Sequence, residues 1–178
     1  EIKSWEMRIL YIFRSLSVWG GIERILVDKM NYLSEMSDME VYLLTTDQGT
    51  HPLTYTLNKK VQVEDLNICF YLQYQYGHFR RIIVRRQMIL RYKQLLADRI
   101  RTIRPDIIVC TTADMISCIV EVKGTIPLVV ESHSICSRTI NYGRNYIHKA
   151  INRLLFLKSL NKADVVVALT KGDAKEIS

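Results

Sequence analysis

Short apolar runs alternate with longer stretches of helical periodicity along the whole chain. The apolar runs carry hydrophobic side chains on both sides, as buried parallel strands do, and polar or turn residues bound them. We expect strands over residues 7–13, 40–46, 61–66, 106–111, 127–131 and 164–169. We expect helices over residues 22–36, 79–104, 113–122, 146–161 and 170–178. This alternation predicts an α/β domain with a doubly wound, mainly parallel sheet and helices on both faces.

The segment 79–104 is the longest predicted helix, and it is strongly basic. Its apolar residues keep to one stripe, as on a helix that packs against a domain. The stripe consists of Phe79, Ile82, Ile89, Tyr92, Leu96, Ile100 and Ile103. Asp98 is the one acidic residue in the segment, so the remaining surface suits anionic membrane lipid. Arg80, Arg81, Arg85 and Arg86 are the candidate membrane contacts, and a polyanion or a solvated face are the alternatives.

Length and composition favour a single globular domain over residues 1–178. The chain has 178 residues, of which 48% are hydrophobic, so a core can form. No apolar run reaches the roughly 18 residues that span a bilayer, and the polar start has no signal-peptide apolar region. These features predict a cytoplasmic protein, soluble or peripheral at the inner face of the membrane. The net charge of +7 favours an anionic partner: a nucleotide, a nucleic acid or a membrane surface.

The cysteines predict neither a disulfide framework nor a metal site. The chain has 4 of them, Cys69, Cys110, Cys118 and Cys136, and no C-x-x-C pair. We expect free thiols, buried where they fall in apolar stretches. His133 and Cys136 form a lone H-x-x-C, which lacks the second ligand pair that zinc needs.

Ligands of an open parallel sheet bind beyond the carboxyl ends of its strands. That rule selects residues 14–21, 45–49, 111–114, 131–134 and 170–172 of the predicted sheet. The candidate acceptor or cleft residues from these segments and their neighbourhood are Arg14, Trp19, Thr112, Ser134, Arg138 and Lys171.

Gly20 and Gly21 separate the first predicted strand from the first predicted helix. Without side chains they let a phosphate approach the backbone, where the helix presents free N–H groups and the positive end of its dipole. A simple glycine turn is the alternative. The glycines are adjacent, so the dinucleotide fingerprint G-x-G-x-x-G is missing, and the G-K-[ST] of a P-loop is missing too.

His133 directly follows a predicted buried strand and lies at the ligand edge. A histidine there can transfer a proton or hydrogen-bond a hydroxyl near neutral pH. A loop histidine bonded to the backbone is the alternative. His133 is the sharpest single candidate by position, and the sequence shows no Ser-His-Asp order, nucleophile elbow or paired-carboxylate pattern.

An ordered set of segments carries a family likeness. The first strand leads into G-G-x-E-R, formed by Gly20, Gly21, Ile22, Glu23 and Arg24, and PDIIVCT, PLVVESH and ADVVVALTKGDAKEI follow. This order and spacing resemble the retaining glycosyltransferases of family 4, which have the GT-B fold. The resemblance covers nearly the whole chain.

The resemblance implies two Rossmann-like domains that face each other across a cleft. The N-terminal domain mainly holds the acceptor, and the C-terminal domain holds the nucleotide-sugar donor and usually an E-x7-E motif. Residues 1–178 correspond to the N-terminal, acceptor-side domain, so we expect the donor-binding domain to be absent from this chain and the chain to be inactive alone. By resemblance, Gly20 and Gly21 approach the donor phosphates, and His133 lies near the transferred sugar. Ser134 stands where many relatives have an acidic or amide residue.

The sequence therefore predicts half of an enzyme of the hexosyltransferase type. It would move a sugar from a nucleotide sugar to an acceptor hydroxyl with retention, in polysaccharide or glycolipid synthesis. The nucleotide sugar is a co-substrate, and no cofactor or metal is expected; sugar or lipid-linked acceptors are the expected partners, and nucleic acid is disfavoured. The alternatives are a nucleotide-sugar epimerase of the same fold and a non-catalytic membrane- or polyanion-binding module.

Overall fold

The fold is built on one parallel sheet. We describe a computed structural model, in which residues 6–112, 115–133, 146–168, 171–172 and 174 are placed. The strands are β1 (Met7–Phe13), β2 (Met39–Thr45), β3 (Gln62–Asp65), β4 (Ile107–Thr111), β5 (Leu128–Ser132) and β6 (Val165–Ala168). They form a 6-stranded sheet in the order β3-β2-β1-β4-β5-β6, and all neighbouring pairs are parallel. The strand order reverses between β1 and β4, which is where such folds bind ligands.

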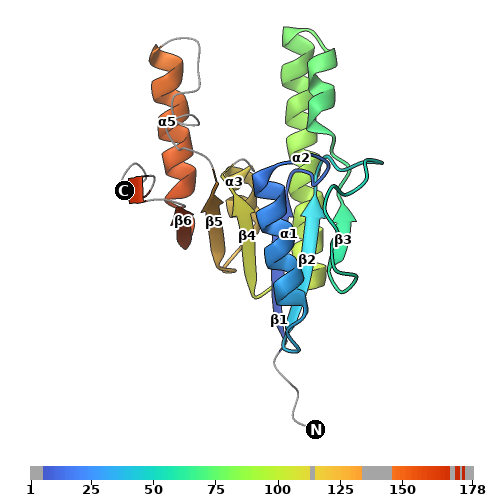
Figure 1. Ribbon diagram of the computed structural model, residues 1–178. Coiled ribbons are helices and arrows are strands. Elements are labelled where there is room, and N and C mark those ends of the chain that lie inside the picture. The colour runs from blue at the N-terminus through green and yellow to red at the C-terminus, as the bar shows by residue number, and fades with distance from the viewer. Residues whose placement is uncertain (1–5, 113–114, 134–145, 169–170, 173, 175–178) are drawn as a thin grey trace.

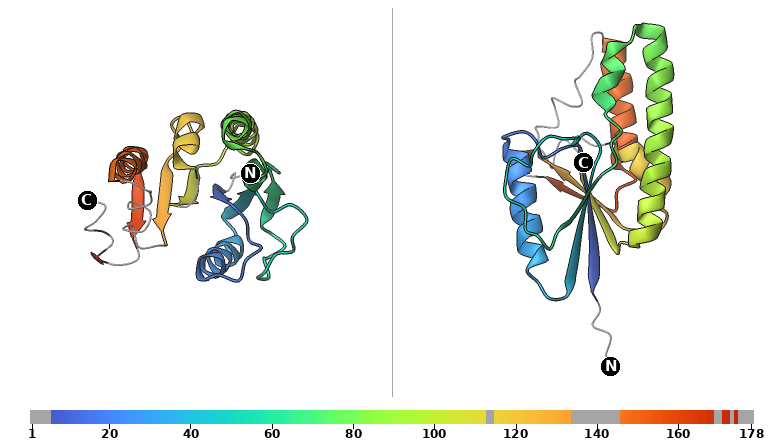
Figure 2. Two further views of the ribbon diagram at one scale, coloured as in Figure 1. Left: turned by 90° about the horizontal axis from the view of Figure 1, so that it is seen from above. Right: turned by 90° about the vertical axis from the view of Figure 1, so that its right-hand side faces the viewer.

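Helices cover both faces of the sheet, as the sequence predicts. They are α1 (Gly21–Ser34), the short 3₁₀ helix η1 (Phe70–Gln75), α2 (His78–Ile103), α3 (Ile116–Val122) and α5 (Tyr146–Leu160). Figure 2 shows α1 on one face, and α2, α3 and α5 on the other. Most of the helix predicted at 170–178 lies outside the described residues.

The core lies on both sides of β1, which explains why that strand reads as an unbroken apolar run. Leu10 and Ile12 point into a cluster beneath α2 and α3. Ile9 and Tyr11 point into a second cluster beneath α1. All of these side chains are buried, so burial on both faces fixes the strand at the centre of the sheet.

The apolar stripe predicted on the long helix is only partly a core stripe. Tyr92, Leu96 and Ile100 are buried, but Phe79 is 88% exposed and Ile82 is 68% exposed. Figure 1 shows the reason: the N-terminal half of α2 extends beyond the carboxyl edge of the sheet. None of the described strands lies beneath this projecting part of the helix, so Phe79, Ile82 and Ile83 stay at the surface, whereas Met88 and Ile89 further along still pack against the core.

The cysteines that fall in apolar stretches are buried thiols. Cys110 and Cys118 are of this kind, and burial raises the pKa of the Cys118 thiol. Cys69 is free and half-buried, and Cys136 lies outside the described residues. Within the described ranges, no group of histidine, cysteine and acidic side chains is placed to hold a metal ion. Among the same residues, no helix is long and apolar enough to cross a bilayer.

Candidate active site

The predicted cleft residues follow different strands at the carboxyl edge of the sheet. Arg14 follows β1, Thr112 follows β4 and His133 follows β5. Lys171 follows the edge strand β6 and is exposed, so it lies away from the β1/β4 switch point. Ser134 and Arg138 lie outside the described residues. The residues of the candidate site therefore come from the loops that follow β1, β2, β4 and β5.

Gly20 and Gly21 form the entry to α1, and neither adopts the left-handed backbone that would require glycine. Gly20 is the N-cap residue, has an extended backbone, and accepts a hydrogen bond from the Arg24 N–H at 3.2 Å. A Cβ on Gly20 would lie 2.1 Å from Oε2 of Glu23, whereas a Cβ on Gly21 would meet nothing within 4 Å. The missing side chain of Gly20 makes room for the Glu23 carboxylate, which lies over the helix N-terminus as suits the positive end of the dipole, whereas the space beside Gly21 is open.

Of the two candidate cleft residues Trp19 and Thr112, the first is exposed and the second is buried. Trp19 is 78% exposed beside the glycine pair and packs edge-on against Tyr55, with ring centroids 5.1 Å apart. Its neighbour Tyr55 donates a hydrogen bond to the carbonyl of Gly20 at 3.2 Å. Thr112 is buried, and its N–H donates to the carbonyl of Glu131 at 3.1 Å. Trp19 is therefore available to a ligand, while Thr112 ties two strand ends together.

Arg14 is anchored to the end of β2 through a buried carboxylate. Its Nε donates to Oδ2 of Asp47 at 2.9 Å, and Oδ1 of Asp47 accepts from the N–H of Phe70 at 2.6 Å. The Asp47 side chain is 4% exposed and the Arg14 side chain is 61% exposed. Both carboxylate oxygens are thus occupied, and the guanidinium is held in place with its terminal nitrogens left for another anion.

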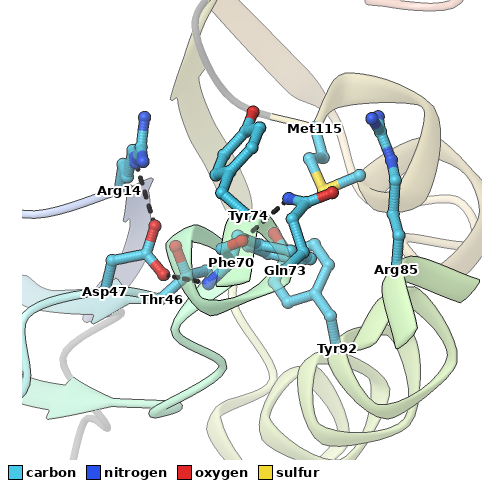
Figure 3. Close-up of a pocket in the computed structure, with 9 residues that line it drawn as sticks. All are labelled: Arg14, Thr46, Asp47, Phe70, Gln73, Tyr74, Arg85, Tyr92 and Met115. Carbon is cyan, nitrogen blue, oxygen red and sulfur yellow. Dashed lines mark hydrogen bonds and ion pairs between the residues drawn. The ribbon is translucent and has the colours of Figure 1, made fainter. Parts of the chain in front are cut away.

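A cavity of about 300 Å³ lies beside this ion pair, on the α2 face of the sheet. Arg14 and Arg85 stand on opposite sides of it, with their guanidinium groups pointing the same way, and Tyr74 lies between them (Figure 3). The other lining residues are Thr46, Asp47, Phe70, Gln73, Tyr92 and Met115. We call this the α2 pocket. Sequence reasoning placed Arg14 at a ligand site but predicted no helix between residues 66 and 79, so it missed the aromatic wall that Phe70 and Tyr74 form.

A second pocket, of about 480 Å³, opens next to the glycine pair. Ser15 and Ser17 line it from the chain between β1 and α1, and Ile22 and Glu23 line it from the first turn of α1. Arg14 and Asp47 also line this pocket, so their ion pair forms part of the wall of both cavities. We call this second cavity the loop pocket. The loop pocket and the α2 pocket are therefore neighbours at the carboxyl edge of the sheet.

His133 belongs to a buried polar cluster on the α1 face. Its Nε2 lies 2.8 Å from Oε2 of Glu131, and Oε1 of Glu131 accepts from Nζ of Lys29 at 2.8 Å. The side chains of His133 and Glu131 are 4% and 8% exposed. Tyr11 lies close enough that burial, and then the charge on Glu131, raise the pKa of its phenol. His133 is thus bonded to a carboxylate rather than to the backbone. Glu131 belongs to the strand-end segment 131–134 that the sequence selects, whereas Lys29 is a functional candidate that the sequence did not reveal.

The fold is that of one half of a GT-B glycosyltransferase. The structure of Phytolacca americana UGT2 complexed with UDP-2fluoro-glucose and pterostilbene matches 94% of this chain, with a TM-score of 0.52 and 12% sequence identity. The match covers 49% of that chain, so the present chain spans about half its length. Residues 19–178 match the model of Glycosyltransferase Family 4, and the chain belongs to this family. No curated protein matches the sequence.

Proposed function

We propose that this domain takes part in moving a sugar from a nucleotide-sugar donor to an acceptor hydroxyl, with retention of configuration. The observation that carries the proposal is His133, held by a carboxylate at the carboxyl end of β5 in a domain of Glycosyltransferase Family 4. We propose further that the transfer is of the hexosyl type and belongs to polysaccharide or glycolipid synthesis. A nucleotide sugar would serve as co-substrate, and the proposal requires no further cofactor.

The donor phosphates would lie at the N-terminus of α1. Gly21 leaves open space there, and free N–H groups of the first turn can donate to an anion. The Glu23 carboxylate now lies over Gly20, so a phosphate would have to displace this flexible side chain. The loop pocket beside it supplies the hydroxyls of Ser15 and Ser17.

The acceptor would occupy the α2 pocket. Its volume of about 300 Å³ is at the small end of ligand sites and suits one sugar unit or a similar group. The exposed aromatic ring of Tyr74 offers a stacking surface, and Arg14 and Arg85 offer two guanidinium groups against the single carboxylate of Asp47. An acceptor that bears an anionic group, such as a lipid-linked phosphate, fits that charge balance.

A second, donor-binding domain would complete the cleft. The similar plant structure is about twice as long and contains a nucleotide sugar, which supports a two-domain enzyme. We expect the natural full-length protein to transfer sugar from a nucleotide-sugar panel to an acceptor, with a product whose anomeric configuration matches the donor by NMR. Residues 1–178 alone should show no turnover. Robust transfer by residues 1–178 would contradict the two-domain proposal, and release of free nucleotide without acceptor product would favour an epimerase.

We also propose that the projecting half of α2 contacts an anionic membrane surface at its cytoplasmic face. Phe79, Ile83 and Leu90 fall on one face of the helix by their spacing and are 88%, 60% and 51% exposed. Arg86 lies in line with them, and Arg80 lies beside the row. An exposed apolar row among arginines can insert between acyl chains while its cations meet lipid headgroups. We call this row the α2 ridge.

Replacing Arg80 and Arg86 by glutamine should weaken binding to vesicles that contain anionic lipid by roughly 30-fold, since each cation near the surface contributes about 1 kcal/mol. Co-sedimentation measures the effect. The matched control replaces Arg91 and Arg101, exposed residues lower on the same helix, and should bind much as the unchanged protein does. Equal losses in both variants would mean that net charge alone drives binding, and unchanged binding in both would reject the α2 ridge.

A further inference from the structure

We infer that Glu131 and Lys29 are positioning residues that fix the proton of the His133 ring on Nε2 and leave Nδ1 as the acceptor for a ligand hydroxyl. The inference rests on the proposed function, because it assigns work to His133 in sugar transfer. It concerns residues from α1 and β5 that the resemblance does not single out.

The geometry assigns each oxygen of the Glu131 carboxylate to one partner. Oε1 accepts from the ammonium of Lys29 and Oε2 lies against Nε2 of His133, both at 2.8 Å. An ionised carboxylate can only accept hydrogen bonds, so Nε2 must carry the proton of this contact. In the neutral ring, Nδ1 then holds the lone pair.

Nδ1 is the unmatched atom of the cluster. It is buried and has no hydrogen-bond partner among the described residues. A buried acceptor without a partner costs on the order of 1–3 kcal/mol, and such groups in native structures often have a catalytic role. A hydroxyl of the acceptor or of the transferred sugar supplies the missing donor. Because Nδ1 is covered, ligand binding must uncover it.

Lys29 is the cation that holds the Glu131 carboxylate in place. Glu131 is buried, and burying a charge is costly unless the charge is paired and hydrogen-bonded; the Lys29 ammonium meets its Oε1 at 2.8 Å. Tyr11 faces the same carboxylate from β1, but a phenol carries no positive charge and cannot replace the cation. Removing the ammonium would leave Oε1 without its donor and free the carboxylate to turn away from Nε2, so that nothing would fix the ring proton there.

The same contacts would also serve a purely structural role, and the experiment separates that role from positioning. Lys29–Glu131 joins α1 to β5, so the cluster could serve only as a staple between helix and sheet. If the cluster only joins helix and sheet, mutating Lys29 or Glu131 should lower the stability of the protein without changing which ring nitrogen of His133 carries the proton. A positioning role changes the ring itself and the catalytic step.

The test measures the imidazole ¹H and ¹⁵N signals of His133 in histidine-labelled full-length protein, with His133→Gln for assignment. We expect a downfield Nε2–H signal and an unprotonated Nδ1 in the unchanged protein. Lys29→Met and Glu131→Gln should shift or remove that signal and lower kcat roughly tenfold with little change in KM. Lys29→Arg, which keeps the charge, should restore both readouts.

The outcomes distinguish this inference from the proposed function. If the His133 signals stay unchanged in Lys29→Met and Glu131→Gln while Tm falls, the cluster is a staple and the inference is overturned. If the signals shift as expected but the full-length protein transfers no sugar, the proton assignment holds and the proposed function fails, which removes the ligand role given to Nδ1. A kcat that falls without any change in the signals also overturns the inference.

Discussion

Replacing His133 by glutamine is expected to lower kcat for sugar transfer by roughly a hundredfold or more, the loss typical of a removed proton-transfer group. Glutamine has a side-chain N–H that can still donate to Glu131, and its amide oxygen can accept a hydrogen bond, but unlike the ring nitrogen it does not take up a proton from a hydroxyl near neutral pH. The folded structure should therefore survive while the chemistry is lost. Initial rates on the full-length protein, at saturating donor and acceptor, measure the effect.

The control for this change is His78→Gln. His78 is exposed at the start of α2, far along the chain from the Glu131 cluster, and its replacement should leave kcat within about twofold, in line with the small effect of ordinary surface changes. If His133→Gln keeps the unchanged kcat, then the buried histidine is a structural residue. The chemistry would then have to be sought around Arg14 and the α2 pocket.

The framework of the fold could be predicted from the sequence because buried parallel strands leave a direct signal. β1 is apolar at every position of its centre, since Leu10 faces one core cluster and Tyr11 the other. The ends of such strands could also be predicted, and with them Arg14 and His133 as residues of the ligand edge. These positions follow from local pattern and from a general rule about parallel sheets.

The partners of these residues could not be predicted, because they depend on contacts between distant segments. Lys29 looks like an ordinary polar residue of a helix, and it meets Glu131 across 102 positions of the chain. The α2 pocket has the same origin, since Arg85 faces Arg14 only once η1 and α2 have packed beside the sheet. The periodicity within one segment does not predict which side chains of a distant segment it will contact.

The exposed start of α2 shows a different limit. Phe79 and Ile82 fall on the same side of a regular helix as the buried Tyr92 and Leu96, so helical periodicity assigns all four to one apolar stripe. Periodicity gives the direction in which a side chain points, but it does not tell where the underlying sheet ends. Whether a side chain is core or surface depends on that edge, which only the structure locates.

Leu96→Ala and Ile82→Ala on the same helix should differ sharply in their effect on stability. Leu96 is fully buried in the core cluster beneath α2, and its truncation should lower the free energy of unfolding by about 2–5 kcal/mol. Ile82 is 68% exposed beyond the sheet edge, and its truncation should change that energy by no more than about 0.5 kcal/mol. Denaturant unfolding, with the slope of the transition compared between variants, measures both values.

The outcome for Ile82 decides what the first half of α2 is for. A loss comparable to that of Leu96→Ala would show that this half packs against another part of the protein, which would leave the α2 ridge covered and unable to reach a membrane. Unchanged stability leaves the large exposed side chains of Phe79, Ile82 and Ile83 without a role in folding. Because burying apolar surface is what favours folding, apolar side chains that gather at the surface without stabilising the fold mark a contact with a partner, and the neighbouring arginines favour an anionic one such as a lipid surface.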